Sequence, residues 1–120
     1  MIRVILAEDH NIVRNGIKML LDSQPEISVV SEASNGQQVL DLINAGSEAD
    51  IVLADINMPQ LDGIALIEEL KKISPQTKLA ILTMLDNDKY VAQAFAAGAC
   101  GYLLKNLGED ELVFGLKAVH

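Results

Sequence analysis

Aromatic side chains are scarce in this 120-residue sequence, which contains two Tyr, two Phe and no Trp. Half of the residues are nevertheless hydrophobic, so a core has to be built from Ile, Leu, Val and Ala. This hydrophobic content excludes an intrinsically disordered chain, in which low hydrophobicity accompanies high net charge. The few aromatic rings also leave little with which to stack a flavin.

Cysteine and long apolar runs are equally scarce. The single cysteine, Cys100, cannot form an internal disulfide, and no base lies near it in the sequence. We therefore interpret it as a small buried hydrophobic residue rather than a nucleophile. No run reaches the ~18 apolar residues of a membrane span, and the first residues lack the features of a secretory leader. The expectation is a cytoplasmic protein without membrane partners.

Basic residues are outnumbered, because nine Lys and Arg face seventeen Asp and Glu, for a formal net charge of −8. A chain this acidic is repelled by phosphate backbones and by anionic lipids. We therefore expect no nucleic-acid binding by this segment. The acid excess is either a solvated surface or conceals a functional cluster, and the positions of the acids have to decide between the two.

Short apolar runs alternate with longer segments of helical periodicity. The apolar runs, typical of strands buried on both faces of a parallel sheet, lie at residues 4–7, 27–30, 51–54, 79–82 and 102–104. The segments with apolar residues at helical spacing lie at 13–21, 39–43, 66–73, 90–97 and 112–119. Five strands alternating with five helices predict a single α/β domain over residues 1–120, a (βα)5 doubly wound parallel sheet with right-handed crossovers.

Capping and turn residues support this division. Asp62 is expected to cap the helix that starts at Gly63, and Ser74-Pro75 to close it. Asn35-Gly36 separates the second strand from its helix, and Gly98 ends the fourth helix.

Polar residues suited to phosphate chemistry follow four of the predicted strands. Glu8 and Asp9 follow the first strand, Asp55 the third, Thr83 the fourth and Lys105 the fifth. Because the carboxyl ends of parallel strands meet at one edge, we expect these side chains to converge. Neighbouring carboxylates repel one another unless a cation intervenes, and Mg²⁺ binds such oxygens while leaving a position for a phosphate oxygen. The pattern indicates phosphoryl chemistry at an aspartate, whereas the missing glycine-rich turn after the first strand disfavours a nucleotide-binding loop.

Four segments together carry a family resemblance over essentially the whole chain. They are Glu8-Asp9, the stretch 55–63 (DINMPQLDG), Leu82-Thr83-Met84 and the stretch 98–105 (GACGYLLK). In this order and on these elements they resemble the receiver domain of two-component response regulators. The last segment looks most like the NarL/LuxR-type regulators. The resemblance implies a flavodoxin-like fold with strand order 2-1-3-4-5.

The same resemblance assigns roles at the site. Asp55 would be the phosphoacceptor, taking a phosphoryl group from a histidine of a sensor kinase. Mg²⁺ would be held by Glu8, Asp9, Asp55 and the backbone carbonyl of Asn57. Lys105 and the metal would spread the charge of the phosphoryl-transfer transition state.

A switch and an output are also implied by the resemblance. Thr83 would hydrogen-bond the phosphoryl group, and Tyr102 would follow it inward and repack the surface of the fourth helix, fifth strand and fifth helix. Homodimerisation after phosphorylation is plausible by the same comparison. A C-terminal helix-turn-helix effector, absent from this chain, would bind DNA and control transcription.

Three positions depart from the commonest family pattern. Asn106 follows Lys105 where many members have a cis proline, which puts the geometry of that peptide in question. Met84 follows Thr83 at a position where a small residue is frequent across the wider family, and we hypothesise that Met84 and Leu85 slow hydrolysis of the aspartyl phosphate by shielding it. Asn57 and Leu85 border the expected path of an attacking water and are expected to tune the lifetime of the acyl phosphate.

Alternative functions are weighed against the same residues. A phosphohydrolase with an aspartate nucleophile needs a second acid two residues after it, and that position holds Asn57. A flavodoxin-like nucleotide binder would need glycine- or hydroxyl-rich phosphate loops. A degenerate receiver is disfavoured by the complete set of acids, Thr and Lys. His10 is expected to be exposed beside the acidic loop and is not interpreted as a catalytic base.

Overall fold

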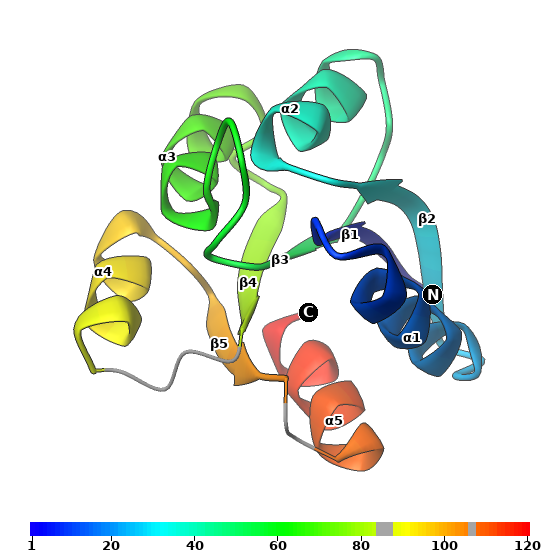
Figure 1. Ribbon diagram of the computed structural model, residues 1–120. Helices are drawn as coiled ribbons and strands as arrows, with labels where there is room; N and C mark the ends of the chain where they lie inside the picture. The colour runs from blue at the N-terminus through cyan, green and yellow to red at the C-terminus, as the bar shows by residue number, and fades with distance from the viewer. Residues whose placement is uncertain (84–87, 106–107) are drawn as a thin grey trace.

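Five strands and five helices alternate along the chain in the computed structural model, which describes residues 1–83, 88–105 and 108–120 (Figure 1). The strands are β1 (Ile2–Ala7), β2 (Ile27–Ala33), β3 (Ile51–Ala54), β4 (Lys78–Thr83) and β5 (Gly101–Leu104). The helices are α1 (Asn11–Asp22), α2 (Gly36–Asn44), α3 (Gly63–Ile73), α4 (Asp88–Ala97) and α5 (Glu109–Val119). The predicted (βα)5 alternation is confirmed.

All strands are parallel and lie in the order β2-β1-β3-β4-β5, as the resemblance implied. Figure 1 shows α2, α3 and α4 on one side of this sheet and α1 and α5 on the other. Successive residues of a strand point to opposite faces, so β1 supplies both layers of the core. Ile5 and Ala7 pack in the layer under α2, α3 and α4, whereas Val4 and Leu6 pack in the layer with α1 and α5.

The edge strand β2 runs three residues further than its apolar run. Its register against β1 shifts between Val4 and Ile5, so Val29 pairs with Val4 and Ser31 with Ile5. Val30 is left without a pairing partner in β1 and is 42% exposed. An edge strand is covered less than a central one, so polar residues continue it where the apolar pattern has already stopped.

The predicted helix boundaries are confirmed at both caps. The Asp62 carboxylate accepts a hydrogen bond from the Ala65 N–H at 2.9 Å, and Asn35 accepts one from the Gln38 N–H at 2.8 Å. Each satisfies a backbone donor that the first helical turn leaves unpaired. Gly98, with φ of +114°, follows α4 in a conformation that other residues rarely adopt.

The interpretation of Cys100 as a buried residue is wrong, because its side chain is exposed. Cys100 lies in the turn between α4 and β5, where its backbone N–H donates to the Leu79 carbonyl at 2.8 Å. Its neighbour Ala99 fills the interior at this turn instead. The apolar composition of the segment did not reveal which residue of the turn faces inward.

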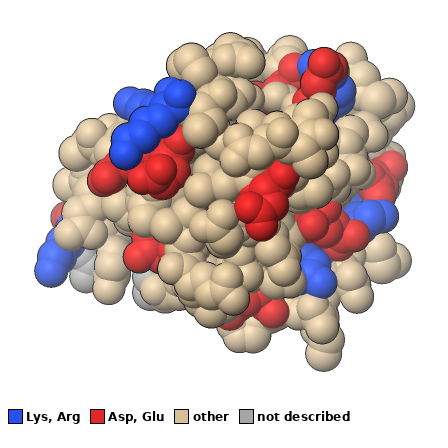
Figure 2. Space-filling model, turned by 90° about the horizontal axis from the view of Figure 1, so that it is seen from above, with Lys and Arg blue, Asp and Glu red and all other residues tan. Residues whose placement is uncertain are grey.

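Charged side chains are distributed in separate groups over the surface. Figure 2 shows acidic groups scattered across the face seen from above, several of them beside basic ones. This agrees with a solvated role for most of the acids. Within the described parts of the chain, no helix combines the length and the apolar character needed to cross a membrane.

Candidate functional site

Glu8 and Asp55 lie side by side at the carboxyl edge of the sheet. Ala7 of β1 pairs with Ala54 of β3, and Glu8 and Asp55 are the residues that directly follow these two strand ends. The Asp55 N–H donates to the Ala7 carbonyl at 3.2 Å, which continues the ladder to the site. Glu8 is 1% exposed and Asp55 7% exposed, so two carboxylates are held away from bulk water.

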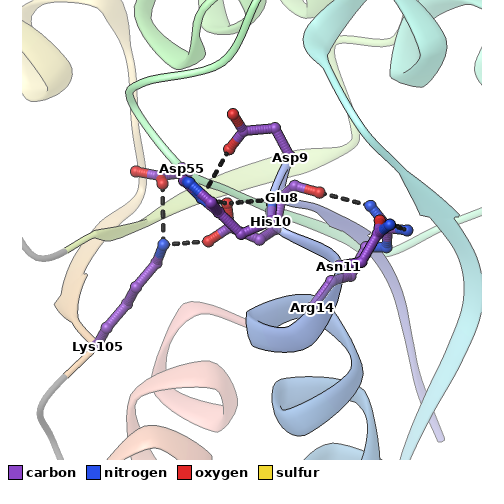
Figure 3. A network of polar contacts seen from close by, with 7 residues as sticks. All are labelled: Glu8, Asp9, His10, Asn11, Arg14, Asp55 and Lys105. Carbon is purple, nitrogen blue, oxygen red and sulfur yellow. Dashed lines mark hydrogen bonds and ion pairs between the residues drawn. The ribbon is translucent and has the colours of Figure 1, made fainter.

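Lys105 joins these two carboxylates (Figure 3). Its Nζ donates to Asp55 Oδ2 at 2.9 Å and to Glu8 Oε1. Burial of the ammonium tends to lower the pKa of Lys105, but the hydrogen bonds that it donates to Glu8 and Asp55 outweigh this effect, so that the pKa is raised above its ordinary value. The ammonium is therefore a permanent positive charge at the site.

Asp9 presents an oxygen that has no hydrogen-bond donor. Its Oδ1 atom is buried and accepts no hydrogen bond from any described residue. The His10 Nδ1 lies 3.2 Å from it and 3.4 Å from Glu8 Oε2, contacts that become ion pairs only when the imidazole is protonated. The His10 side chain is 71% exposed, as expected beside an acidic loop.

The donor atoms at this edge fit a small divalent cation. Glu8, Asp9 and His10 each offer one ligand atom, and these atoms lie within 4.8 Å of one another. Carboxylate oxygens suit Mg²⁺, and a buried oxygen without a donor is what a cation satisfies. Asp55 adjoins this group through Lys105. Asn57 lies two residues after Asp55 and is exposed. The role of its backbone carbonyl as a ligand stays a prediction.

The loop after β3 is fixed by close backbone contacts. A Cβ atom on Gly63 would collide with the Asp55 carbonyl, and one on Gly36 with the Leu61 carbonyl. The Gly63 N–H donates to the Ile56 carbonyl at 2.9 Å. Met58 is buried and fills the apolar side of the loop. These contacts seat the start of α3 directly against the backbone of Asp55.

Thr83 and Tyr102 occupy neighbouring strands next to the site. Thr83 ends β4 and is 1% exposed, and its carbonyl accepts a hydrogen bond from the Lys105 N–H at 2.9 Å. Tyr102 pairs with Ile81, two residues before Thr83, and packs half-buried against the core under α2, α3 and α4. Alternation along β4 therefore places the Thr83 side chain on the same face of the sheet as Tyr102.

Arg14 belongs to the site as well, and the sequence reasoning missed it. Its Nη1 donates to the Glu8 carbonyl at 2.7 Å and its Nη2 to Asn11 Oδ1 at 2.7 Å. A lone arginine on the polar side of a helix is ordinarily a solvated residue. The available signal was its position one helical turn after the acidic loop, from which a long side chain can reach back.

Three residues singled out in the sequence, Met84, Leu85 and Asn106, lie outside the described residues. The shielding hypothesis for Met84 and Leu85 and the question of the peptide at Asn106 both stay predictions.

Comparison with known proteins agrees with this arrangement. The family model of the response regulator receiver domain matches residues 4–117. The chain is 35% identical over 117 residues to the nitrate/nitrite response regulator protein NarL of Escherichia coli (strain K12) and 33% identical over 118 residues to the transcriptional regulatory protein DegU of Brevibacillus brevis. Both alignments cover 98% of this chain but only 52% and 50% of those proteins. The chain thus spans about half the length of the curated relatives it matches.

Solved structures give the same likeness. A LuxR-family two-component response regulator from Aurantimonas sp. SI85-9A1 superposes with a TM-score of 0.92 at 31% identity, covering 99% of this chain and 84% of the other. The signal receiver domain of a NarL response regulator from Mycobacterium tuberculosis superposes with a TM-score of 0.91 at 31% identity, covering 98% of this chain and 95% of the other.

Proposed function

Because this chain belongs to the response regulator receiver domain family, with NarL- and LuxR-type regulators among its relatives, we propose that it accepts a phosphoryl group on Asp55 from a sensor histidine kinase in a Mg²⁺-dependent reaction. The observation that carries the proposal is the buried Asp55 carboxylate, which shares the Lys105 ammonium with Glu8. A structural aspartate needs no second buried acid beside it, whereas a phosphoacceptor needs cationic surroundings for the incoming anion.

In the proposed reaction, a carboxylate oxygen of Asp55 attacks the phosphorus of a phosphohistidine. The new oxygen–phosphorus bond forms as the nitrogen–phosphorus bond breaks, and the electron pair stays on the imidazole of the kinase. Lys105 lies within hydrogen-bond distance of Asp55 and stabilises the negative charge that gathers on the phosphoryl oxygens. Glu8, Asp9, Asp55 and the Asn57 carbonyl would hold Mg²⁺, which would supply further positive charge to the reaction.

Thr83 and Tyr102 are the proposed switch residues. The Thr83 hydroxyl would donate to a phosphoryl oxygen on Asp55, and Tyr102 would then move inward against the fourth helix. The two side chains lie on the same face of the sheet, on neighbouring strands, which supports a coupling between them. A local change of charge would thereby repack the surface formed by α4, β5 and α5, on which a second copy of the chain could associate.

The output is proposed from the relatives. Two of them are named as transcriptional or nitrate/nitrite response regulators, and each is about twice as long as this chain. We propose that the receiver over residues 1–120 acts with a C-terminal helix-turn-helix domain that binds DNA. The receiver itself is a signalling domain rather than a metabolic enzyme.

The proposal is tested with acetyl phosphate as the phosphodonor. Incubation with Mg²⁺ should add one phosphoryl group to the chain, as measured by intact mass spectrometry, and Asp55→Asn should abolish the adduct. Asp62→Asn is the matched control, because Asp62 lies on the same loop but caps α3, a role that asparagine retains. An adduct that persists in Asp55→Asn, or none in the unchanged protein, would remove Asp55 from the role of phosphoacceptor.

A further inference from the structure

Arg14 is a mostly buried charged residue at the carboxyl edge of the sheet, and the proposed reaction does not use it. Its side chain is 16% exposed, and its Nε lies 3.4 Å from Glu32 Oε1 of β2. The Nε atom is buried and has no hydrogen-bond acceptor among the described residues. Burying a guanidinium with an incomplete set of partners costs free energy. The hydrogen bonds that Arg14 does make are therefore expected to offset this cost.

Those contacts hold the backbone that carries the acidic pair. Figure 3 shows the guanidinium extending from α1 toward the loop of residues 8–10. Its Nη1 donates to the carbonyl of Glu8, which is the peptide group shared by Glu8 and Asp9. Its Nη2 donates to Asn11 Oδ1 at the first residue of α1. One planar fork therefore connects the loop to the start of the helix.

The loop is also held by the Glu8 N–H, which donates to the Ala33 carbonyl at 3.0 Å. His10, the N-cap of α1, makes no side-chain capping hydrogen bond in the described part of the chain. The His10 N–H instead donates to Glu8 Oε2 at 3.3 Å. A cation bound by the Glu8 carboxylate would compete with the His10 N–H for this oxygen. The hydrogen bond from Arg14 uses the Glu8 carbonyl rather than the carboxylate, so it persists when the carboxylate is occupied.

We infer that Arg14 is a positioning residue for the divalent-cation site: it fixes the Glu8–Asp9 peptide and thereby the direction in which the Asp9 carboxylate faces the ion. This inference rests on the proposed function, because it assigns a role in Mg²⁺ binding. In this role Arg14 would act through the Glu8–Asp9 peptide and not as a ligand of the ion.

The test compares Mg²⁺ affinity in Arg14→Lys and Arg14→Gln with that of the unchanged protein. Lysine keeps the positive charge but cannot reproduce the forked pair of hydrogen bonds to the Glu8 carbonyl and Asn11 Oδ1, so a positioning role predicts weaker binding in both variants. We expect the Kd for Mg²⁺ to rise about tenfold or more, the usual effect of losing a residue that orients a ligand. Calorimetric titration is suitable because the chain has no Trp to report binding by fluorescence.

Arg3→Gln is the matched control. Arg3 also forms hydrogen bonds and ion pairs, to Asp50 and Glu48, but at the opposite edge of the sheet. It should change thermal stability while leaving the Kd for Mg²⁺ unaltered. A second measurement separates positioning from general damage, because saturating Mg²⁺ should restore the phosphorylation rate of Arg14→Lys toward that of the unchanged protein.

Each outcome decides the inference. Weaker binding in both Arg14 variants with normal binding in Arg3→Gln supports it. Normal Mg²⁺ affinity in folded Arg14→Lys and Arg14→Gln overturns it and leaves the proposed function intact, provided that Asp9→Asn loses the ion. If the unchanged protein binds no Mg²⁺, or Asp9→Asn binds it normally, the proposed metal site is wrong and the inference is overturned with it.

Discussion

The two edges of the sheet both carry ion pairs between distant segments, but they differ in burial. At the carboxyl edge, the side chains of Lys105, Glu8 and Asp55 are 13%, 1% and 9% exposed. At the amino edge, Arg3 joins Asp50 and Glu48, whose side chains are 25% and 80% exposed. Buried charges lose hydration that exposed charges keep, so only the carboxyl edge is expensive to build.

The charge balance differs in the same way. Glu8 and Asp55 share the Lys105 ammonium at the carboxyl edge, and Asp9, next to Glu8, adds a third acid whose Oδ1 atom accepts no hydrogen bond from the described residues. The amino-edge carboxylate of Asp50 accepts hydrogen bonds from the Arg3 backbone N–H and guanidinium. The charges of the amino edge are thus paired with one another, whereas the carboxyl edge keeps the negative charge to which the proposed cation would bind.

Replacing Lys105 by alanine should have the largest effect on stability. Two buried carboxylates would lose their shared cation, and we expect the free energy of unfolding to fall by about 2–3 kcal/mol, somewhat less than for a fully enclosed pair. Urea denaturation in the presence of a chelator measures this loss. Mg²⁺ should recover part of it, because the ion binds the folded state only. A Lys105→Ala variant as stable as the unchanged protein would show that the two carboxylates do not need the shared ammonium for stability.

Replacing Asp9 by asparagine should act in the opposite direction. Removing the charge of a partly exposed carboxylate whose buried Oδ1 atom has no donor should raise the free energy of unfolding by up to about 1 kcal/mol in the absence of divalent ions. The same change should remove most of the stabilisation gained from Mg²⁺. Parallel urea titrations with and without the ion test both expectations, and a destabilised Asp9→Asn would contradict the idea of an uncompensated charge.

Asp50→Asn at the amino edge should have the smallest effect, with a characteristic pH dependence. Side-chain and backbone hydrogen bonds from Arg3 hold the pKa of Asp50 below its ordinary value. The lowered pKa means that the ionised carboxylate stabilises the folded state above the unfolded pKa of about 4, and that this contribution is lost as the pH falls through the folded pKa.

The difference in stability between the unchanged protein and Asp50→Asn should therefore be present at pH 7 and shrink under acidic conditions. Denaturation at neutral and acidic pH measures this difference. A difference that persists unchanged in acid would assign it to packing rather than to the ionised group.

Much of the fold could be predicted because its signals are local. The apolar run at residues 51–54 coincides with β3, and the caps at Asn35 and Asp62 mark the starts of α2 and α3. The prediction fell short at β2, where edge exposure admits Ser31 and Glu32 into a strand. It failed at Cys100, because neighbouring residues of a turn differ in burial for reasons that lie in the surrounding packing.

The candidate site was predictable to a lesser degree. The convergence of Glu8, Asp55 and Lys105 follows from parallel topology, which places strand ends together whatever their separation in sequence. The contact of Arg14 with the acidic loop was harder to predict, because one of its partners is the Glu8 backbone carbonyl and backbone groups have no signature in the sequence.

By itself the sequence determined the order of strands and helices, the absence of a glycine-rich phosphate loop after β1, and the acids and lysine at the strand ends. Periodicity and capping act over a few residues, so a linear pattern contains them. Only the tertiary structure decided which carboxylate shares the lysine, which oxygen lacks a donor and which arginine holds the acidic loop. Those properties depend on the burial of side chains and on distances between segments up to 97 residues apart in the sequence, which are set when the sheet assembles.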